Sequence, residues 1–360
     1  MLAGMDRRSL LLWLAASPAF ANAQARSALR FPADFGAHPQ TRTEWWYLTG
    51  SLQSGARLWG FQITFFRAST GIDAASASRF NPSQLLFAHA ALTDLEQQRL
   101  RHDQRIARGG FGIAQARGDD TGVVLRDWQM DRAPRPGDPP LSRYTANVAS
   151  DSAGFALALQ CDATQPVLLQ GDAGVSKKGP AAGDTSRYYS EPQLAVQGRL
   201  TLDGQPVAVQ GRAWLDHEWS DGFIPHGAVG WDWIGMNLDD GSALTAFRLR
   251  RADGGSVYAG GSFRRAGEAV RAFGPDEVRF TPGRVWESAA SRARYPVQWQ
   301  VETPAGRYAV NALLDNQELD SRGSSGAIYW EGLSALRDAG GRTVGRGYLE
   351  MTGYAAALRL

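Results

Sequence analysis

Lysine and cysteine are nearly absent from this chain of 360 residues. Lys177 and Lys178 are the two lysines, so arginine supplies almost all of the 38 basic residues. The arginines are scattered in runs no longer than two, and 36 acidic residues leave a formal net charge of +2. A nucleic-acid-binding protein gathers basic residues into a patch or stripe, so we expect no nucleic-acid partner.

The single cysteine, Cys161, excludes an intramolecular disulfide. It ends the segment 155–161, in which large residues alternate with small or polar ones. This two-residue period is typical of a strand with one buried face. We therefore interpret Cys161 as a buried core residue rather than a nucleophile.

Signatures of several enzyme classes are also missing from the sequence. No Gly-x-Ser-x-Gly segment indicates a serine hydrolase, and no Gly-x-x-x-x-Gly-Lys loop indicates a nucleotide-binding protein. Residues 217–221 (His-Glu-Trp-Ser-Asp) differ from the zinc-protease motif His-Glu-x-x-His at the fifth position. They also follow an expected strand instead of opening a helix, so we expect no metal and no cofactor.

No apolar run approaches the ~20 residues that a membrane span needs. The short apolar run 10–16 follows Arg7-Arg8 and precedes Ala-Asn-Ala at residues 21–23. A basic start, a short apolar stretch and a small-x-small site predict a cleavable export signal over residues 1–23. The paired arginines suit the twin-arginine and the general secretory routes about equally. We expect a periplasmic or secreted protein with no transmembrane segment in the mature chain.

Glycine and tryptophan are abundant, with 41 and 12 residues, and 43% of the chain is hydrophobic. Long runs of helix-forming residues are absent, and alternation with a period of two is common. Trp59, Phe61, Ile63 and Phe65, for example, share one face of an expected strand. The composition predicts a β-rich chain with a packed core, long enough for two domains.

An internal repeat divides the chain. When residues 44–55 are placed over 230–241, Trp45 meets Trp231 and Tyr47 meets Trp233, and each segment predicts a hairpin with a tight turn. Without a gap the alignment continues to Leu58 with Leu244 and Phe61 with Phe247. Nearer the end of each unit, residues 211–216 (Gly-Arg-Ala-Trp-Leu-Asp) match 345–350 (Gly-Arg-Gly-Tyr-Leu-Glu), and 189–191 echo 329–331.

The repeat predicts two tandem β-domains related by internal duplication, over residues 30–220 and 225–357. Each unit has many expected strands and large aromatic residues, which is typical of a closed barrel or a curved sandwich. Barrels of this size can hold one apolar ligand. The fold class is therefore all-β, with two β-barrel domains.

Several long, tryptophan-rich segments resemble the AttH-type lipocalin-like proteins. They are residues 31–39, 42–47, 61–67, 188–190, 213–219, 230–233 and 347–354, so the resemblance spans nearly the whole expected mature chain. The family includes the carotenoid 1,2-hydratases (hydroxyneurosporene synthases). The resemblance implies two tandem lipocalin-like β-barrels. It also suggests a role associated with ABC transport, with an ABC transporter as a possible partner.

The segment 216–219 (Asp-His-Glu-Trp) ends the first unit where the second has Glu-Met-Thr-Gly at 350–353. His217 and Trp219 break the pattern of the repeat, so structure common to both units does not require them. On a strand they share one face, and Asp216 and Glu218 share the other. If the protein is an enzyme, we expect His217, Trp219 and Asp216 to be catalytic. The alternative is that His217 is a hydrogen-bonded histidine at the domain boundary.

The aromatic hairpins of both units are the expected ligand contacts. The candidate binding residues are Glu44, Trp46, Tyr47, Trp231, Asp232 and Trp233. The alternative for Glu44 is an ion pair with an arginine such as Arg42. Asp232 either faces solvent or is buried against an arginine. His89 is interpreted as a core histidine whose hydrogen bonds are satisfied.

Two functions fit these residues. The leading hypothesis is an exported protein that binds a long apolar ligand, an isoprenoid or a lipid. The alternative is a cofactor-free hydratase or isomerase of an isoprenoid double bond. By the resemblance, the hydratases of this family carry a His-x-Trp, which His217 and Trp219 match. They also carry a Tyr and an Asp in the strand after the second hairpin. Residues 245–249 (Thr-Ala-Phe-Arg-Leu) contain neither, which favours the binding protein.

Either function places the ligand where the two units meet, near Trp231 and Trp233. Trp219→Ala is expected to weaken ligand binding, because a buried indole contributes a large apolar area. Trp128→Ala, outside this junction, is expected to alter stability more than affinity.

Overall fold

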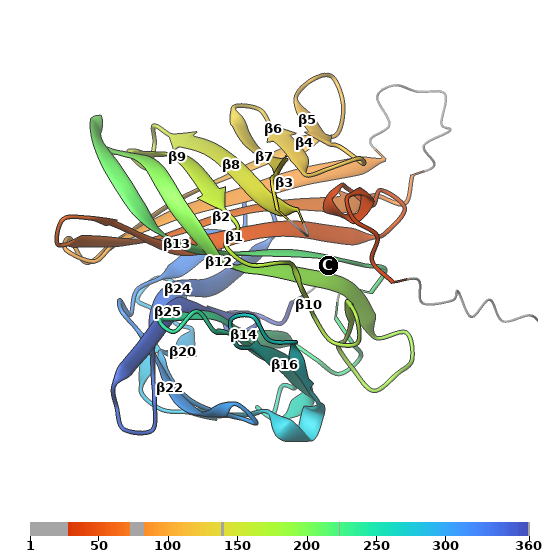
Figure 1. The fold of residues 1–360 in the computed structure, drawn as a ribbon, viewed down its shortest axis with the longest axis vertical. Helices are drawn as coiled ribbons and strands as arrows, with labels where there is room; N and C mark the ends of the chain where they lie inside the picture. Colours follow the sequence, from red (N-terminus) through yellow and green to blue (C-terminus); the bar gives the residue numbers. More distant parts are fainter. Residues whose placement is uncertain (1–27, 73–82, 138–139, 223, 359–360) are drawn as a thin grey trace, which may run out of the picture.

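The computed structural model describes residues 28–72, 83–137, 140–222 and 224–358. Within these ranges the regular structure is strand, apart from two 3-10 turns, η1 (Ala33–Phe35) and η2 (Pro275–Glu277). The strands form two large sheets and a two-stranded ribbon (Figure 1). The protein is therefore all-β with two units, as predicted. No helix in the described ranges has the length and apolarity to cross a membrane, and the expected signal over residues 1–23 lies outside them.

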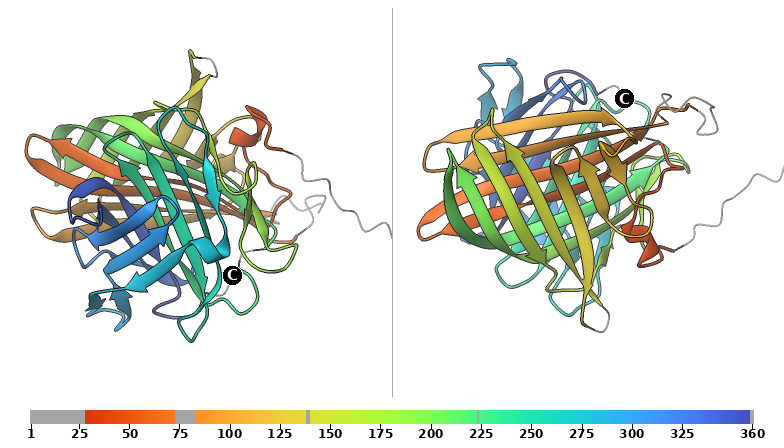
Figure 2. Two further views of the ribbon diagram at one scale, coloured as in Figure 1. Left: turned by 60° about the horizontal axis from the view of Figure 1, so that its bottom comes forward. Right: turned by 90° about the horizontal axis from the view of Figure 1, so that it is seen from above.

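Within the described residues, sheet A holds thirteen strands in the order β4-β3-β2-β1-β13-β12-β9-β8-β7-β6-β5, with β10 and β11 paired to β12. Its edge strands β4 and β5 are neighbours in sequence, so residues 109–113 hold the two edges close and the sheet curls into a near-barrel (Figure 2). The strands are β1 (Thr43–Ser54), β2 (Arg57–Ser69), β3 (Gln84–Asp94), β4 (Arg99–Arg108), β5 (Ala114–Ala116), β6 (Gly122–Leu125), β7 (Trp128–Arg135), β8 (Leu141–Ser150), β9 (Phe155–Asp162), β10 (Leu168–Leu169), β11 (Val175–Lys177), β12 (Thr185–Leu202) and β13 (Gln205–Ser220).

Sheet B repeats this plan and, in the part of the chain that the structure describes, has ten strands in the order β17-β16-β15-β14-β25-β24-β22-β21-β18, with β23 paired to β24. Its edges β17 and β18 are again neighbours in sequence, here joined through η2. The strands are β14 (Gly230–Leu238), β15 (Ala243–Arg250), β16 (Ser256–Arg264), β17 (Arg271–Phe273), β18 (Arg279–Pro282), β21 (Gln298–Thr303), β22 (Gly306–Ala312), β23 (Glu318–Ser321), β24 (Ala327–Arg337) and β25 (Thr343–Met351). The ribbon pairs β19 (Val285–Glu287) with β20 (Arg294–Pro296).

The first strand of each unit pairs with the last strand of the same unit. Tyr47 lies opposite Asp216 between β1 and β13, and Trp233 lies opposite Glu350 between β14 and β25. The sequence alignment of Tyr47 with Trp233 and of Asp216 with Glu350 therefore agrees with the strand register. Descent of both units from one duplicated copy stays a prediction.

The strand register contradicts two of the residue matches in the repeat, Leu58 with Leu244 and Phe61 with Phe247. Tyr47 pairs with Thr64, seventeen positions on, whereas Trp233 pairs with Phe247, fourteen positions on. The second hairpin has a shorter connection, so Phe247 occupies the place of Thr64 and not of Phe61, and Leu244 is displaced from Leu58 in the same way.

The echo of residues 189–191 in 329–331 is out of step by one residue. Asp216 lies opposite Ser190, and Glu350 lies opposite Glu331, so Ser190 and Glu331 are the equivalent pair. By the same count Tyr188 corresponds to Tyr329. The corrected register places a second acid, Glu331, at a position where the first unit has a serine.

Among the described residues, large aromatic side chains fill the interior of sheet A and leave no room there for a ligand. Trp46, Trp59, Phe61, Trp128 and Tyr144 are all fully buried there. A separate apolar cluster joins the two sheets and includes Tyr47, Trp214, Trp233, Phe247, Leu333 and Tyr348. The space available to a ligand therefore has to be sought between the sheets.

Candidate active site

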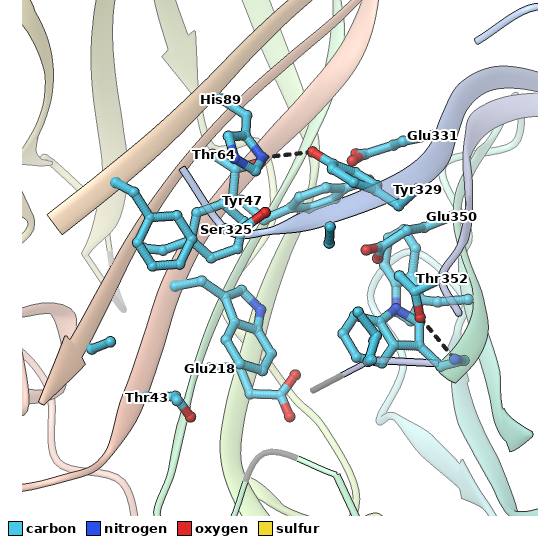
Figure 3. Close-up of a pocket in the computed structure, with 18 of the residues that line it drawn as sticks. Thr43, Tyr47, Thr64, His89, Glu218, Ser325, Tyr329, Glu331, Glu350 and Thr352 are labelled. Carbon is cyan, nitrogen blue, oxygen red and sulfur yellow. Dashed lines mark hydrogen bonds between the residues drawn. The ribbon is translucent and has the colours of Figure 1, made fainter. Parts of the chain in front are cut away.

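A cavity of about 860 Å³ lies between sheets A and B. It is at the junction of the two units, the place at which the sequence analysis expected a site. Figure 3 shows side chains from both sheets converging on it. The aromatic rings that line it are Trp45, Tyr47, Phe66, Phe87, Tyr188, Trp231, Trp233, Phe247 and Tyr329.

Strand alternation decides which residues reach the cavity. Along β1, Trp45 and Tyr47 line it, whereas Trp46 points into the core of sheet A. Along β13, Asp216 and Glu218 line it, whereas His217 points the other way. The edge of the Tyr47 ring meets Trp233 at a centroid separation of 5.4 Å, so equivalent residues of the two units touch.

Asp216 is buried at the cavity wall and accepts three hydrogen bonds. The donors are Ser190 Oγ at 2.5 Å, Trp214 Nε1 at 2.7 Å and Tyr188 Oη at 2.7 Å. Burial raises the pKa of Asp216 to about 7, although the three hydrogen bonds favour its ionised form and oppose the shift. Asp216 can therefore exchange a proton near neutral pH, which suits acid–base work.

Glu331 and Glu350 form a second acidic group on the opposite wall. They lie directly opposite each other on β24 and β25, and both line the cavity. Burial and the neighbouring charge of Glu350 raise the pKa of Glu331 well above its usual range. Burial also raises the pKa of Glu350 to about 7; a hydrogen bond from the Trp231 side chain opposes the shift, and the charges of Asp216 and Glu218 add to it.

Glu218 differs from these acids because it has a cation. Lys178 Nζ lies 2.8 Å from Glu218 Oε1 and also sits over the rings of Tyr188 and Phe247, 4.8 and 4.6 Å from their centroids. This ion pair gives the cavity a charged, polar corner beside its aromatic wall.

His89 lines the cavity as a neutral, hydrogen-bonded side chain. Its Nδ1 is 2.8 Å from Tyr329 Oη, and its Nε2 is 2.9 Å from Ser324 Oγ (Figure 3 shows the first bond). Burial lowers the pKa of His89 to about 3. Both ring nitrogens have partners, as expected for a satisfied histidine.

His217 belongs to a buried cluster behind the cavity wall. Glu44 Oε1 accepts from His217 Nε2 at 2.9 Å and from His38 Nδ1 at 2.8 Å, and Glu44 Oε2 accepts from Arg67 Nε at 2.7 Å. Trp219 stacks on His38 at 3.7 Å. Burial favours the neutral form of Glu44, but hydrogen bonds from His217 and His38 hold its pKa well below the usual range.

His38, Glu44 and His217 are also the one group among the described residues whose side-chain atoms, all within 4.8 Å, could surround a metal ion. Each contact of Glu44 has hydrogen-bond length, and Arg67 supplies a positive charge to the same carboxylate. The donor set is satisfied by hydrogen bonds alone, and a cation there would be repelled by the guanidinium.

The structure therefore sorts the expected residues into two places. Asp216, Tyr47, Trp231 and Trp233 line the cavity. Glu44 touches the cavity, but its carboxylate belongs to the histidine cluster, and its arginine is Arg67 instead of Arg42. The side chains of His217, Trp219 and Trp46 lie in the interior of sheet A, with His217 stacked on Trp46 at 4.6 Å.

Asp232 is fully buried behind the wall of the cavity, so it does not face solvent. Arg248 Nε lies 2.7 Å from its carboxylate, and Tyr354 Oη donates to it at 2.8 Å. The second of the two interpretations, burial against an arginine, is the one observed. Strand alternation places Asp232 on the opposite face from Trp231 and Trp233, which reach the cavity.

Glu331 and Glu350 are the site acids that sequence reasoning missed. Glu350 was aligned with Asp216 across the repeat, and this equivalence was the signal that could have identified it. Glu331 was missed because the repeat alignment of β12 with β24 was wrong by one residue and matched Glu331 with Glu191 instead of Ser190.

Trp233→Ala is expected to weaken binding of N-phenyl-1-naphthylamine, a neutral fluorescent probe for apolar sites, about tenfold or more. A buried indole contributes roughly 1.5–3 kcal/mol by area, and Trp233 lines the cavity. Fluorescence titration measures the Kd. Trp219→Ala and Trp128→Ala, both in the core of sheet A, should lower Tm and leave the Kd near wild type. Equal loss of affinity in all three variants would contradict this assignment of the cavity.

The contribution of Asp216 and Glu350 to stability should fall as pH rises from about 4 to about 7. The folded protein holds protons on Asp216 and Glu350 up to about pH 7, whereas the unfolded chain releases them near pH 4. Folding therefore takes up protons in this window, and this contribution is lost as pH passes the folded pKa. Urea midpoints at pH 5, 6, 7 and 8 measure it. As pH rises, the double variant Asp216→Asn/Glu350→Gln should become more stable relative to wild type. Parallel plots of urea midpoint against pH for the two proteins would refute the assignment.

Known proteins share this architecture. The AttH-like family profile matches residues 22–354. A crystal structure of an AttH candidate from Nitrosomonas europaea is 44% identical, with a TM-score of 0.83 over 92% of this chain and 98% of that chain. Kievitone hydratase from Nectria haematococca has the same fold at 16% identity, with a TM-score of 0.69 over 93% and 95% of the two chains. A search of curated proteins gave no match. The chain belongs to the AttH-like family.

Proposed function

We propose that this protein is a hydratase that adds water across a carbon–carbon double bond of an apolar molecule held between the two sheets. One observation carries the proposal: carboxyl groups with raised pKa values share a single cavity with aromatic rings from both units. A simple binding protein needs the rings but has no use for buried acids, which are costly to place in an apolar site.

Alkene hydration requires a proton donor, stabilisation of the carbocation and a base that activates water. Asp216 and the pair Glu331–Glu350 lie on opposite walls, so donor and base can act on opposite sides of a bound double bond. The indole rings of Trp231 and Trp233 line the cavity, and an indole ring can stabilise positive charge. The residues of the cavity thus cover all three needs of the reaction.

The shape of the cavity wall supports an elongated substrate. Trp45, Phe66 and Phe87 line the cavity, and together with Ile106, which lies beyond it, they are successive cross-strand partners on β1, β2, β3 and β4. Strands lie about 4.8 Å apart, so this row extends roughly 14 Å away from β13 and its acids. The Phe66 and Phe87 rings stack at 4.6 Å, and Ile106 is 40% exposed, so the row reaches the surface. A chain-shaped isoprenoid or lipid fits such a track.

Two comparisons bear on the choice of reaction. Kievitone hydratase shares the fold, which shows that this architecture can hold a hydratase. The Tyr and Asp that the carotenoid 1,2-hydratases carry after the second hairpin are absent from residues 245–249. In this chain β13, β24 and β25 supply the acids instead. We therefore propose the reaction class, with an acyclic isoprenoid as the first substrate to test.

Incubation with acyclic carotenoids in ¹⁸O-labelled water tests the proposal. Mass spectrometry should find one labelled oxygen added per hydrated double bond. The same method identifies molecules that co-purify with the protein. Retention of unmodified ligand without label incorporation would overturn the hydratase and leave the binding protein. Glu268→Gln, an exposed acid far from the cavity walls, is the matched control for variants.

Export belongs to the proposal as well. Cleavage after residue 23 predicts a mature chain that begins at Gln24. N-terminal sequencing of protein from the periplasm of a bacterial host tests this, and crosslinking there tests an association with an ABC transporter.

A further inference from the structure

Glu331 and Glu350 are two carboxyl groups confined to the same wall of one cavity. They are cross-strand partners in an antiparallel pair, where opposite Cβ atoms lie about 4.5–5.5 Å apart. Figure 3 shows both carboxyl groups on the side of the cavity formed by β24 and β25. Two carboxylates this close, in a buried site, cannot both be ionised without a large repulsion.

The surroundings of the pair offer no cation. Among the described residues, neither acid forms an ion pair, whereas Glu218 pairs with Lys178 and Glu44 with Arg67. Glu331 is 3% exposed, its Oε1 has no hydrogen-bond partner within the described ranges, and the neighbouring Tyr47 hydroxyl favours the ionised form of the carboxyl. Glu331 lines the cavity, where a proton on the pair would be available to a bound molecule.

The groups that face the pair come from three neighbouring elements and from the pair's own strands, and the titratable ones among the neighbours lie on β1 and β13. Across the junction, β1 presents Tyr47, and β13 presents Asp216 and Glu218. Tyr329 on β24 and Tyr348 on β25 are neutral phenols, since burial raises their pKa values well above the usual range. The side chain of Trp231 on β14 donates to Glu350. The charges of Asp216 and Glu218 favour retention of a proton on the pair, and Lys178 offsets part of the charge of Glu218 through their ion pair.

We propose that Glu331 and Glu350 share one proton at neutral pH and that this pair is the proton donor of the hydration. Proton sharing is a property of the protein alone, whereas the donor role rests on the proposed function. The two acids are catalytic residues in this assignment, and Asp216 on the opposite wall is the base.

The hydration consumes the alkene and one water and needs no other reactant. The pair gives its proton to one alkene carbon, and the π electrons form the new C–H bond and leave a carbocation on the other carbon. A water oxygen forms a C–O bond to that carbon, and the proton it sheds goes to the Asp216 carboxylate. Proton transfer through solvent from Asp216 back to the pair restores the starting state, so one water is added in total.

Infrared spectroscopy tests the shared proton without a substrate. The C=O stretching band of a protonated carboxylic acid should persist in wild type at pH 7.5, and it should shift in D₂O. The double variant Glu331→Gln/Glu350→Gln should lose most of this band, and the exposed control Glu268→Gln should keep it. A wild-type spectrum with no protonated carboxyl at pH 7.5, or a double variant with an unchanged band, would overturn the inference.

The pH profile of hydration tests the donor role. In Glu331→Gln the remaining acid loses its partner and ionises more readily, so the rate should fall about tenfold at pH 7.5 and the alkaline limb should move to lower pH. Unchanged rates and alkaline limbs in Glu331→Gln and in Glu350→Gln would overturn the donor role. If wild type hydrates no alkene while the infrared band is present, the proposed function fails but the shared proton stands.

Discussion

Glu44→Gln is expected to lower the free energy of unfolding by about 3–5 kcal/mol, because it leaves a buried charge without its partner. Glu44 and Arg67 are 1% and 2% exposed, and their ion pair is 2.7 Å long. Glutamine keeps the shape but directs an amide N–H, instead of an acceptor, toward at least one of the donors. His217 and His38 each lose a charged acceptor in the same substitution.

Urea unfolding at pH 7 measures this effect. Glu268→Gln removes an exposed carboxylate and should change the unfolding free energy by less than about 0.5 kcal/mol. The double variant Glu44→Gln/Arg67→Met should recover part of the loss, because no unpaired charge remains. If Glu44→Gln is as stable as wild type, the buried ion pair of Glu44 with Arg67 does not stabilise the fold.

Asp216→Asn is expected to lower the rate of hydration by about 10²–10⁴-fold, because it removes the base while preserving the side-chain shape. Its carboxylate is fixed by Ser190, Trp214 and Tyr188, so its position depends on the fold and not on the substrate. An amide cannot accept the proton that water sheds. The rate is measured as ¹⁸O incorporation at saturating substrate.

Binding of N-phenyl-1-naphthylamine separates a chemical effect from a structural one. Asp216→Asn should bind the probe with a Kd close to wild type, because the aromatic wall is intact. Asp276→Asn, an exposed residue of η2, is the matched control for both measurements. A variant that binds the probe normally and still hydrates at the wild-type rate would remove Asp216 from the mechanism.

The sequence predicted the fold from features that are local or repeated. Alternation placed Asp216 and Glu218 on one face of β13 and His217 on the other, and the structure agrees. The repeat aligned Tyr47 with Trp233, and the two rings meet across the junction. These predictions succeed because strand periodicity and the position of a residue in a repeat are visible in a single sequence.

The roles of the site residues were harder to predict because they depend on which face of a strand meets the other sheet. His217 and Trp219 broke the repeat and were expected to be catalytic, yet their side chains pack inside sheet A with His38 and Trp46. Their neighbours on the other face reach the cavity. Arg67 as the partner of Glu44 was also beyond sequence reasoning, because it comes from β2 at a register set by the whole hairpin.

The pairing of β1 with β13 also sets the order in which the chain can fold. Residues 43–54 can complete their pairing only after residues 205–220 are available. This pairing joins segments that are far apart in the sequence, and contacts of that kind form slowly. Until β13 is synthesised, β1 is the free edge of the meander β1–β4 and can pair with another chain. Fragments that end before residue 205 should therefore aggregate during synthesis, even though most of the strands of sheet A are already present in them.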